Sequence, residues 1–149
     1  MRKIYIGADS AGFTLKEEFK AHLAGLGYET VDVGAYNAES SHYPLFANAV
    51  CEGVKKDGEN AFGVLICGTG IGMSMCANKH RGIRAAVCSD TFSAKMTRRH
   101  NDANVLCLGA RVVGPSLALD ILDAFLENEF EKESPRHVLR VDMIRELEK

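Results

Sequence analysis

An apolar run that ends in a cysteine and a glycine-rich loop constrains this chain more than any other stretch. Residues 64–67 read Val-Leu-Ile-Cys, glycines follow at positions 68, 70 and 72, and residues 73–79 resemble the first turns of a helix. Unbroken apolar runs are typical of buried parallel strands, and a glycine-rich turn into a helix presents backbone N–H groups to an anion. We therefore predict a strand–loop–helix unit with Cys67 at the carboxyl end of the strand, where open α/β sheets bind ligands.

Segments with strand character alternate with segments of helical periodicity along the whole chain. Strands are expected at residues 3–7, 28–34, 61–66, 82–88 and 104–109, and helices at 13–26, 44–54, 73–79, 90–100, 116–126 and 136–147. Because no hairpin signal such as Asn-Gly joins two strands, the sheet should be parallel with helices on both faces. The prediction is a doubly wound α/β domain, five-stranded and flanked by helices, that covers residues 1–149 as a single domain. The last helix, about residues 136–148, follows a polar break and is a candidate for packing on another subunit.

Charge and composition argue against several classes of protein. The formal net charge is −2 and the basic residues are scattered, which disfavours nucleic acid as the main partner. No segment approaches the ~18 consecutive apolar residues of a transmembrane helix, and residues 1–3 do not open a secretion leader. Five cysteines without a Cys-x-x-Cys pair indicate reduced thiols rather than a zinc knuckle or a redox pair. We therefore expect a cytoplasmic protein that holds no metal and does not enter a membrane.

The glycine loop has four conceivable interpretations. A dinucleotide fingerprint would need its third glycine where Met73 stands, and it belongs to the first strand of its unit, although Asp90 lies at a suitable distance for a ribose-binding acid. A Walker loop is excluded because no Gly-Lys-Ser/Thr follows. A turn with only a structural role stays open. We favour a cradle for a small anion or an enolate, and we expect no cofactor.

Cys67 is either a core thiol or a catalytic base. A cysteine in an apolar run is most often a small buried hydrophobe. Its place before consecutive loop amides at a helix N-terminus favours the second interpretation, because thiolates are stabilised there. The other four cysteines lack that context and are expected in the core or on helix faces.

Other polar residues near predicted strand and helix ends have two interpretations each. Asp9 and Ser10 follow the first strand and either cap the next helix or share a rim with Cys67. His100, beside Asn101, either favours the C-terminal dipole of its helix or transfers a proton to a sugar oxygen.

A pair of arginines near the C-terminus could bind a phosphate. Arg136 and Arg140 are one helical turn apart and form a fork suited to that group. The alternative is a solvated basic face paired with Glu133 or Asp142.

Motifs distributed over the whole chain resemble the type B ribose-5-phosphate isomerases and the related galactose-6-phosphate isomerase subunits. The matching segments are Gly7-Ala8-Asp9, Tyr43-Pro44, residues 66–72, Ala77-Asn78-Lys79, residues 82–85, 100–105 and 109–114, and Arg136-His137 with Arg140. The resemblance implies a Rossmann-like αβα sandwich that works as a homodimer or a dimer of dimers, with its sites between subunits. It also implies interconversion of an aldose phosphate and a ketose phosphate through a cis-enediolate, without metal or nucleotide.

The resemblance also suggests roles for individual residues. Cys67 would move the carbon-bound proton, while Thr69 and His100 would help to open the sugar ring. Asp9 and Asn101 would bind sugar hydroxyls, and the loop amides would hold the enediolate oxygens. The full set of expected substrate-binding residues is Asp9, Ser10, His42, Tyr43, Gly68, Gly70, Ile71, Gly72, Asn101, Arg111, Arg136 and Arg140, of which the three arginines would hold the phosphate, some from the partner subunit.

Three departures from the family pattern concern the substrate rather than the chemistry. Ser10 replaces the usual histidine, His42 stands where many ribose-5-phosphate isomerases have an acid, and the loop at residues 131–135 is longer and more charged. Ribose 5-phosphate and ribulose 5-phosphate are the default pair, with another tetrose, pentose or hexose phosphate as the variant. A non-catalytic sugar-phosphate sensor and a nicotinamide-dependent enzyme are the alternatives from other classes.

Overall fold

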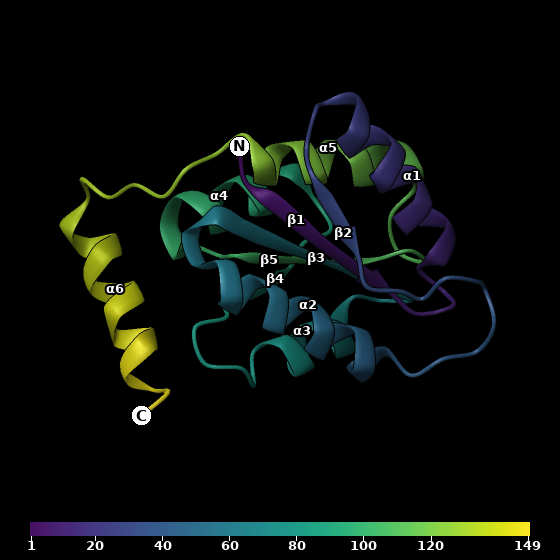
Figure 1. The fold of residues 1–149 in the computed structure, drawn as a ribbon. Coiled ribbons are helices and arrows are strands. Elements are labelled where there is room, and N and C mark those ends of the chain that lie inside the picture. Colours follow the sequence, from purple (N-terminus) through teal and green to yellow (C-terminus); the bar gives the residue numbers. More distant parts are fainter.

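The computed structural model describes residues 1–149 as a parallel sheet covered by helices on both faces (Figure 1). The strands are β1 (Lys3–Ala8), β2 (Thr30–Asp32), β3 (Ala61–Cys67), β4 (Ala85–Val87) and β5 (Val105–Gly109). The helices are α1 (Phe13–Gly25), α2 (Tyr43–Asp57), α3 (Ile71–Ala77), α4 (Thr91–Asn101), α5 (Pro115–Leu126) and α6 (Pro135–Glu146), with a 3₁₀ turn at Gly58–Asn60. The predicted fold class is confirmed. None of these helices is both long and apolar enough to span a membrane.

The sheet has the strand order β2-β1-β3-β5-β4, and every neighbouring pair is parallel. β3 lies at the centre and all seven of its residues are buried, which explains its unbroken apolar sequence. Helices α1, α4 and α5 cover one face around Phe19 and Phe125, and α2 and α3 cover the other around Val50 and Met73. Two apolar cores therefore enclose the sheet as an αβα sandwich.

The two edge strands are shorter than the sequence predicts. β2 has three residues where we expected 28–34, and β4 has three where we expected 82–88. Each edge strand pairs with only one neighbour, so fewer of its residues are fixed in a ladder. Helix α3 also ends at Ala77 rather than Lys79, because the side chain of Asn78 exchanges two hydrogen bonds with the backbone of Ala85 (2.8 and 2.9 Å).

The direction of the chain reverses between β1 and β3. From β1 the chain builds β2 on one side through α1, and it then crosses through α2 to form β3 on the other side of β1. The loops after β1 and β3 consequently lead to opposite faces of the sheet, and a crevice lies between them at the carboxyl ends of these two strands. Asp9 follows β1 and Cys67 ends β3, so both lie at this switch point.

Helix α6 stands apart from the sandwich, at the end of the sheet opposite that crevice (Figure 1). Val141 is its only buried residue, whereas Leu139, Met143 and Leu147 are 60–84% exposed. The C-terminal turn that follows is tied to the body through Glu148, whose carboxylate accepts from the amide of Gly82 (3.0 and 3.1 Å). A cleft of about 660 Å³ separates α6 from the ends of α3 and α4.

Candidate active site

The carboxyl ends of β1, β3 and β5 meet at one edge of the sheet. Ala8 pairs with Ile66, and Cys67 pairs with Gly109. The backbone continues these pairings beyond the strands: the amide of Ala110 donates to the carbonyl of Cys67 (2.8 Å). This edge therefore brings together the loops that carry nine of the predicted site residues, namely Asp9, Ser10, Cys67, Gly68, Thr69, Gly70, Ile71, Gly72 and Arg111.

Cys67 lies at the base of the glycine loop with its side chain directed to a loop amide. The N–H of Gly70 donates to Sγ over 3.1 Å, and the residue is 6% exposed. This contact directs the sulfur toward the backbone amides of the loop. By contrast, burial raises the pKa of the Cys51 thiol to about 12 and that of Cys88 to about 11. These two are core thiols, as the sequence predicted, whereas the sulfur of Cys67 accepts a hydrogen bond from a backbone amide.

The glycine loop is shaped by close approaches that side chains would block. Gly70 has φ +79°, and a Cβ there would lie 2.8 Å from the carbonyl carbon of Leu108. A Cβ on Gly72 would lie 2.5 Å from Cε1 of Tyr43, so that ring packs against the loop. The hydroxyl of Thr69 accepts from the amide of Ile71 (3.3 Å). The loop is thus held in one shape by its neighbours on both sides.

Asp9 has a local role and a free oxygen. Its Oδ1 accepts from the amide of Gly12 (3.1 Å), a local hydrogen bond before the helix of the kind that the sequence analysis gave as one of two interpretations. Its Oδ2 has no hydrogen-bond partner in the chain, and the residue is half-buried. Ser10, beside it, is half-buried as well. Both remain available to a ligand in the crevice.

Two further predicted residues lie at this edge, at the start of α2, beside Arg111 from the loop after β5. Tyr43 is the first residue of α2, and the exposed His42 precedes it. Arg111 lies over the loop: its amide donates to the carbonyl of Gly68 (3.0 Å), and a Cβ on Gly68 would be 3.6 Å from its Nη1. A guanidinium at this place can balance an anion that the loop amides bind.

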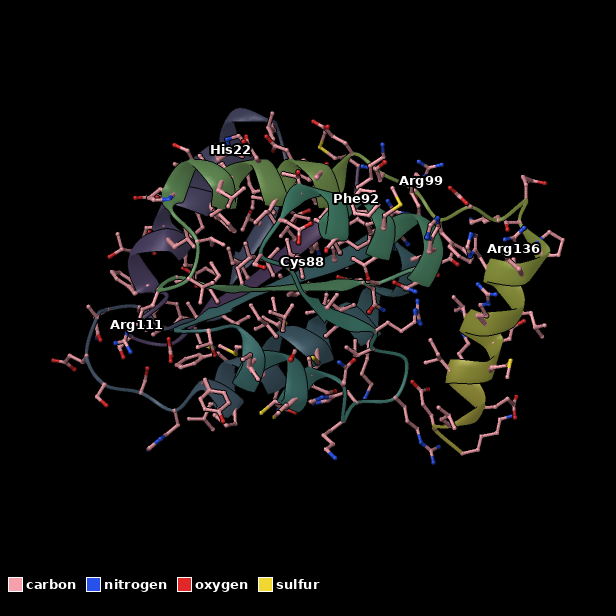
Figure 2. All side chains as sticks on the ribbon, turned by 180° about the vertical axis from the view of Figure 1, so that it is seen from behind. His22, Cys88, Phe92, Arg99, Arg111 and Arg136 are labelled. Atoms are coloured by element: carbon pink, nitrogen blue, oxygen red, sulfur yellow. The ribbon has the colours of Figure 1, made fainter.

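The remaining predicted residues lie at the other end of the sheet. His100 and Asn101 end α4, just before β5 begins, and Arg136 and Arg140 are on α6. Figure 2 shows Arg111 and Arg136 at opposite ends of the molecule. β5 alone separates the two edges by about 13 Å, at roughly 3.3 Å per residue. One chain therefore does not bring His100 to Cys67, nor all three arginines to one phosphate.

The three predicted phosphate-binding arginines have no acidic partner. Arg111, Arg136 and Arg140 are exposed and take part in none of the ion pairs within 4.0 Å. Asp142, which could have neutralised this face of α6, pairs instead with Arg145 (3.0 Å). The alternative of a self-paired basic face therefore does not hold for Asp142, and these guanidiniums are free to meet an anion.

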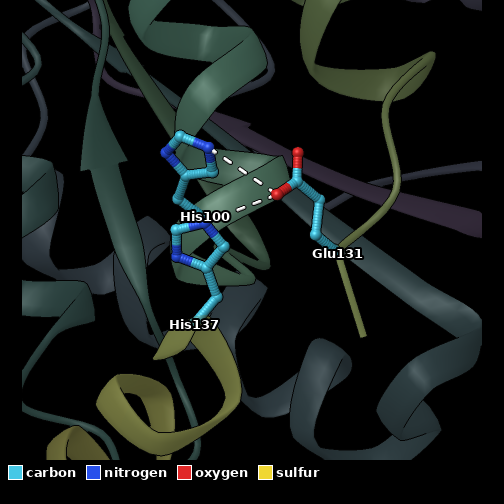
Figure 3. Close-up of side chains that lie close together, drawn as sticks. All are labelled: His100, Glu131 and His137. Atoms are coloured by element: carbon cyan, nitrogen blue, oxygen red, sulfur yellow. Dashed lines mark ion pairs between the residues drawn. The ribbon is translucent and has the colours of Figure 1, made fainter. Parts of the chain in front are cut away.

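Two residues that sequence reasoning did not count among the site residues lie beside His100. Nε2 of His137 lies 3.4 Å from Oε2 of Glu131, and Nε2 of His100 lies 3.9 Å from the same oxygen (Figure 3). Burial, His100 and the neighbouring arginines lower the pKa of His137, which favours its neutral form. The only sequence signal was that His137 directly follows Arg136, and Glu131 stood within a charged run interpreted as a break.

A parallel α/β sheet with a thiol, loop amides and an unpaired arginine at its switch point defines a class of α/β proteins that bind small anionic ligands in that crevice. Comparison with known proteins narrows the class. A sequence profile described as "Ribose/Galactose Isomerase" matches residues 4–144. The chain belongs to this family of isomerases.

Individual relatives resemble the chain over most of its length. It is 48% identical to ribose-5-phosphate isomerase B of Escherichia coli (strain K12), covering 99% of this chain and 97% of that one. It is 47% identical to D-erythrulose-4-phosphate isomerase of Pectobacterium atrosepticum, covering 88% and 86%. The solved ribose-5-phosphate isomerase B of Clostridium thermocellum superposes with a TM-score of 0.94 at 51% identity, covering 98% and 97%.

Proposed function

We propose that this protein interconverts an aldose phosphate and a ketose phosphate by moving a proton between C1 and C2, with ribose 5-phosphate and ribulose 5-phosphate as the default pair. The observation that carries the proposal is the thiol of Cys67, which accepts from the Gly70 amide at the switch point of the sheet. A base beside preorganised N–H donors is what removal of a proton next to a carbonyl requires.

The chemistry follows from the positions of base and donors. Cys67 removes the proton from C2 of the open-chain aldose, and negative charge develops on the carbonyl oxygen at C1. The amides of residues 68–72 bind the enediolate oxygens, and removing one such donor typically costs roughly 3–4 kcal/mol of transition-state stabilisation. The hydroxyl proton then passes from the oxygen on C2 to the oxygen on C1, and return of the carbon-bound proton from Cys67 to C1 gives the ketose. No redox co-reactant is consumed, because the aldehyde and the hydroxyl exchange oxidation states within one molecule.

A complete site requires a second copy of the chain. Cys67 and Arg111 lie at one edge of the sheet, whereas His100, Asn101, Arg136 and Arg140 lie at the other. A twofold dimer can place the second group of one subunit over the first group of its partner. The exposed apolar side chains of α6 and the cleft beneath it suit such an interface. We therefore propose a homodimer or dimer of dimers with sites at the interface. Five free cysteines suit the reducing cytoplasm.

The identity of the sugar phosphate is the second part of the proposal. Ser10 stands where the family usually has histidine, which enlarges the crevice and removes one cationic contact. One relative is a D-erythrulose-4-phosphate isomerase, so the scaffold is compatible with the same chemistry on a tetrose phosphate. Ribose 5-phosphate stays the default because proteins named for it match the chain at 48–51% identity over nearly its whole length.

A substrate panel tests both parts. Purified protein is incubated with tetrose, pentose and hexose phosphates, and ketose formation is measured. Turnover of ribose 5-phosphate at least about tenfold above all others, a difference of roughly 1.4 kcal/mol in transition-state binding, would end the variant hypothesis. Binding without turnover of any sugar phosphate would leave the non-catalytic sensor. A shift of the melting temperature by NAD or NADP would favour the nicotinamide-dependent alternative instead.

A further inference from the structure

Glu131 and His100 form a carboxylate–imidazole pair that the proposed mechanism does not yet use. Nε2 of His100 faces Oε2 of Glu131 at 3.9 Å, and the imidazole is 39% exposed. Hydrogen bonds in unliganded sites are often long and tighten when substrate binds. Nδ1, the other ring nitrogen, has no hydrogen-bond partner in the chain. One nitrogen therefore faces a carboxylate and the other is free.

The carboxylate of Glu131 is itself held in place. Its Oε1 forms an ion pair with the guanidinium of Arg99, and its backbone N–H donates to the carbonyl of Arg99 (3.0 Å). The link connects the loop before α6 to the last turn of α4. Because these two contacts with Arg99 fix Glu131, its Oε2 already points at the two imidazoles and does not have to be ordered when substrate binds.

His137 fixes the plane of the His100 ring. The two imidazoles stack with centroids 4.2 Å apart and an interplanar angle of 16° (Figure 3). The lone pairs of stacked rings lie in separate, nearly parallel planes, so both cannot converge on one ion at about 2.0–2.1 Å, the usual zinc–nitrogen distance. Although His100, His137 and Glu131 could be taken for a metal-binding group, their arrangement suits hydrogen bonding.

We propose that Glu131 is a positioning residue that accepts Nε2–H of His100 and thereby keeps Nδ1 unprotonated toward the sugar ring. The proposal rests on the aldose–ketose isomerase function. In the ring-opening step, Nδ1 takes the proton of the anomeric hydroxyl, C1=O forms, and the bond between C1 and the ring oxygen breaks with its electron pair on that oxygen. The same proton then passes from the imidazolium to the ring oxygen. Glu131 stabilises the imidazolium between these transfers, as a buried carboxylate does in other His–Asp pairs.

The test separates ring opening from carbon-acid chemistry. Ribose 5-phosphate closes a furanose ring, whereas ribulose 5-phosphate cannot, because its 5-hydroxyl carries the phosphate. Glu131→Gln should slow conversion of ribose 5-phosphate roughly 10- to 100-fold, the range of a weakened general acid–base contribution. It should leave exchange of the C1 proton of ribulose 5-phosphate with deuterated water unchanged, because that exchange needs only Cys67 and the enediolate cradle.

A second measurement uses the isotope effect of ribose 5-phosphate deuterated at C2. If ring opening has become rate-limiting, the isotope effect of Glu131→Gln falls toward one. A merely structural defect would slow exchange and conversion together and leave the isotope effect in place, which would overturn the proposal. If Glu131→Gln fails to fold, Arg99→Gln is the second variant, because it removes the ion pair that holds the Glu131 carboxylate. It should also slow conversion of ribose 5-phosphate and leave the exchange of the C1 proton unchanged.

The matched control is Asp123→Asn. Asp123 pairs with His22 at 2.7 Å between α5 and α1, so it is another carboxylate–imidazole pair, but it lies away from His100. Conversion and exchange should both equal those of the wild type. If the wild type neither converts ribose 5-phosphate nor exchanges the C1 proton of ribulose 5-phosphate, the isomerase function fails. If the wild type does both and Glu131→Gln matches it in both, only the role of Glu131 fails.

Discussion

The amide of Gly70 donates a hydrogen bond to Sγ of Cys67 across 3.1 Å, three residues along the same loop. This contact closes the turn between β3 and α3 and fixes the thiol where the β1 and β3 loops diverge. The same loop amides that would bind an oxyanion thus also orient the proposed base. The loop between β3 and α3 thus serves both the fold and the proposed reaction. Substitutions in it should show which of its residues affect stability and which affect turnover.

Replacing Cys67 by serine should remove turnover and keep binding. The hydroxyl is similar in shape and still accepts from Gly70, but it ionises far less readily than a thiol. We expect kcat to fall by roughly 10²- to 10⁴-fold, the usual contribution of a general base, while calorimetry finds ribose 5-phosphate binding little changed. Cys76→Ser, a half-exposed thiol on α3, is the control and should stay active. Activity retained in Cys67→Ser would show that another group is the base.

Adding one methyl group to Gly109 should disturb the glycine loop from below. A Cβ there would lie 2.7 Å from backbone atoms of Thr69, which cannot rotate away. We expect a loss of about 1–3 kcal/mol in the free energy of unfolding, as for other overpacked sites, together with lower kcat. Gly25→Ala adds the same methyl group in open space on α1, and it should be neutral or stabilising by up to about 1 kcal/mol. Equal urea midpoints for the two variants would refute the close approach.

A buried ion pair between α1 and β2 predicts how stability depends on pH. Nζ of Lys16, which is fully buried, lies 2.6 Å from Oδ2 of Asp32, and Lys20 adds a second contact. Burial alone would raise the pKa of Asp32, but hydrogen bonds from both lysines more than reverse this, so its pKa lies below 3.8. A carboxyl with a depressed folded pKa stabilises the fold above its unfolded pKa, and that stabilisation is lost as the pH falls through the folded value.

Asp32→Asn should therefore destabilise the protein at neutral pH and matter less in acid. We expect a loss of about 3 kcal/mol at pH 7, because Lys16 is left without its main partner, and a smaller difference from the wild type at pH 3. Urea unfolding at both pH values measures this. Glu146→Gln, in an exposed pair with Lys149, serves as the control and should change little at either pH. A deficit of the same size at pH 3 and pH 7 would contradict the assignment.

The sequence was sufficient to predict the strand–loop–helix unit around Cys67. It was not sufficient to predict contacts between side chains that lie far apart in the sequence. The apolar run, the glycines and the capping of α4 by Asp90, whose Oδ1 accepts from Ser93, follow from local rules. The pairing of Lys16 with Asp32 depends on where α1 packs, and nothing in their spacing encodes it. Arg98 is similar: arginine is rarely buried, yet this one is buried and donates to the carbonyl of Ala103 (2.6 Å).

The separation of the predicted site into two groups also depends on topology. β5 inserts between β3 and β4, and α4 runs back along the sheet, so its C-terminal residues His100 and Asn101 finish at the amino ends of the strands. Motif matching alone lists these residues together with Cys67. Only the strand order and helix direction reveal that they lie at opposite edges.

Arg140 should contribute to phosphate recognition rather than to sugar binding. Its guanidinium is exposed and has no acidic partner, and a hydrogen bond to a charged group is worth about 1.5–3 kcal/mol. Arg140→Ala should therefore weaken binding of ribose 5-phosphate by roughly 10- to 100-fold and leave competition by free ribose unchanged. Arg145→Ala, on the same helix but already paired with Asp142, should change neither by a comparable amount. Equal losses for the phosphorylated and the free sugar would count against a phosphate role.

Mixing two inactive variants tests the shared site directly. Cys67→Ala disables one edge of the sheet, and His100→Gln disables the other. If each site combines Cys67 of one subunit with His100 of its partner, a mixed dimer holds one intact site and one doubly altered site. Refolding equal amounts of the two variants together should then restore roughly a quarter of wild-type activity, since half of the dimers are mixed and half of their sites are intact. Each variant refolded alone should stay inactive. A mixture that remains inactive while size-exclusion chromatography and subunit exchange demonstrate mixed dimers would mean that each chain builds its own site.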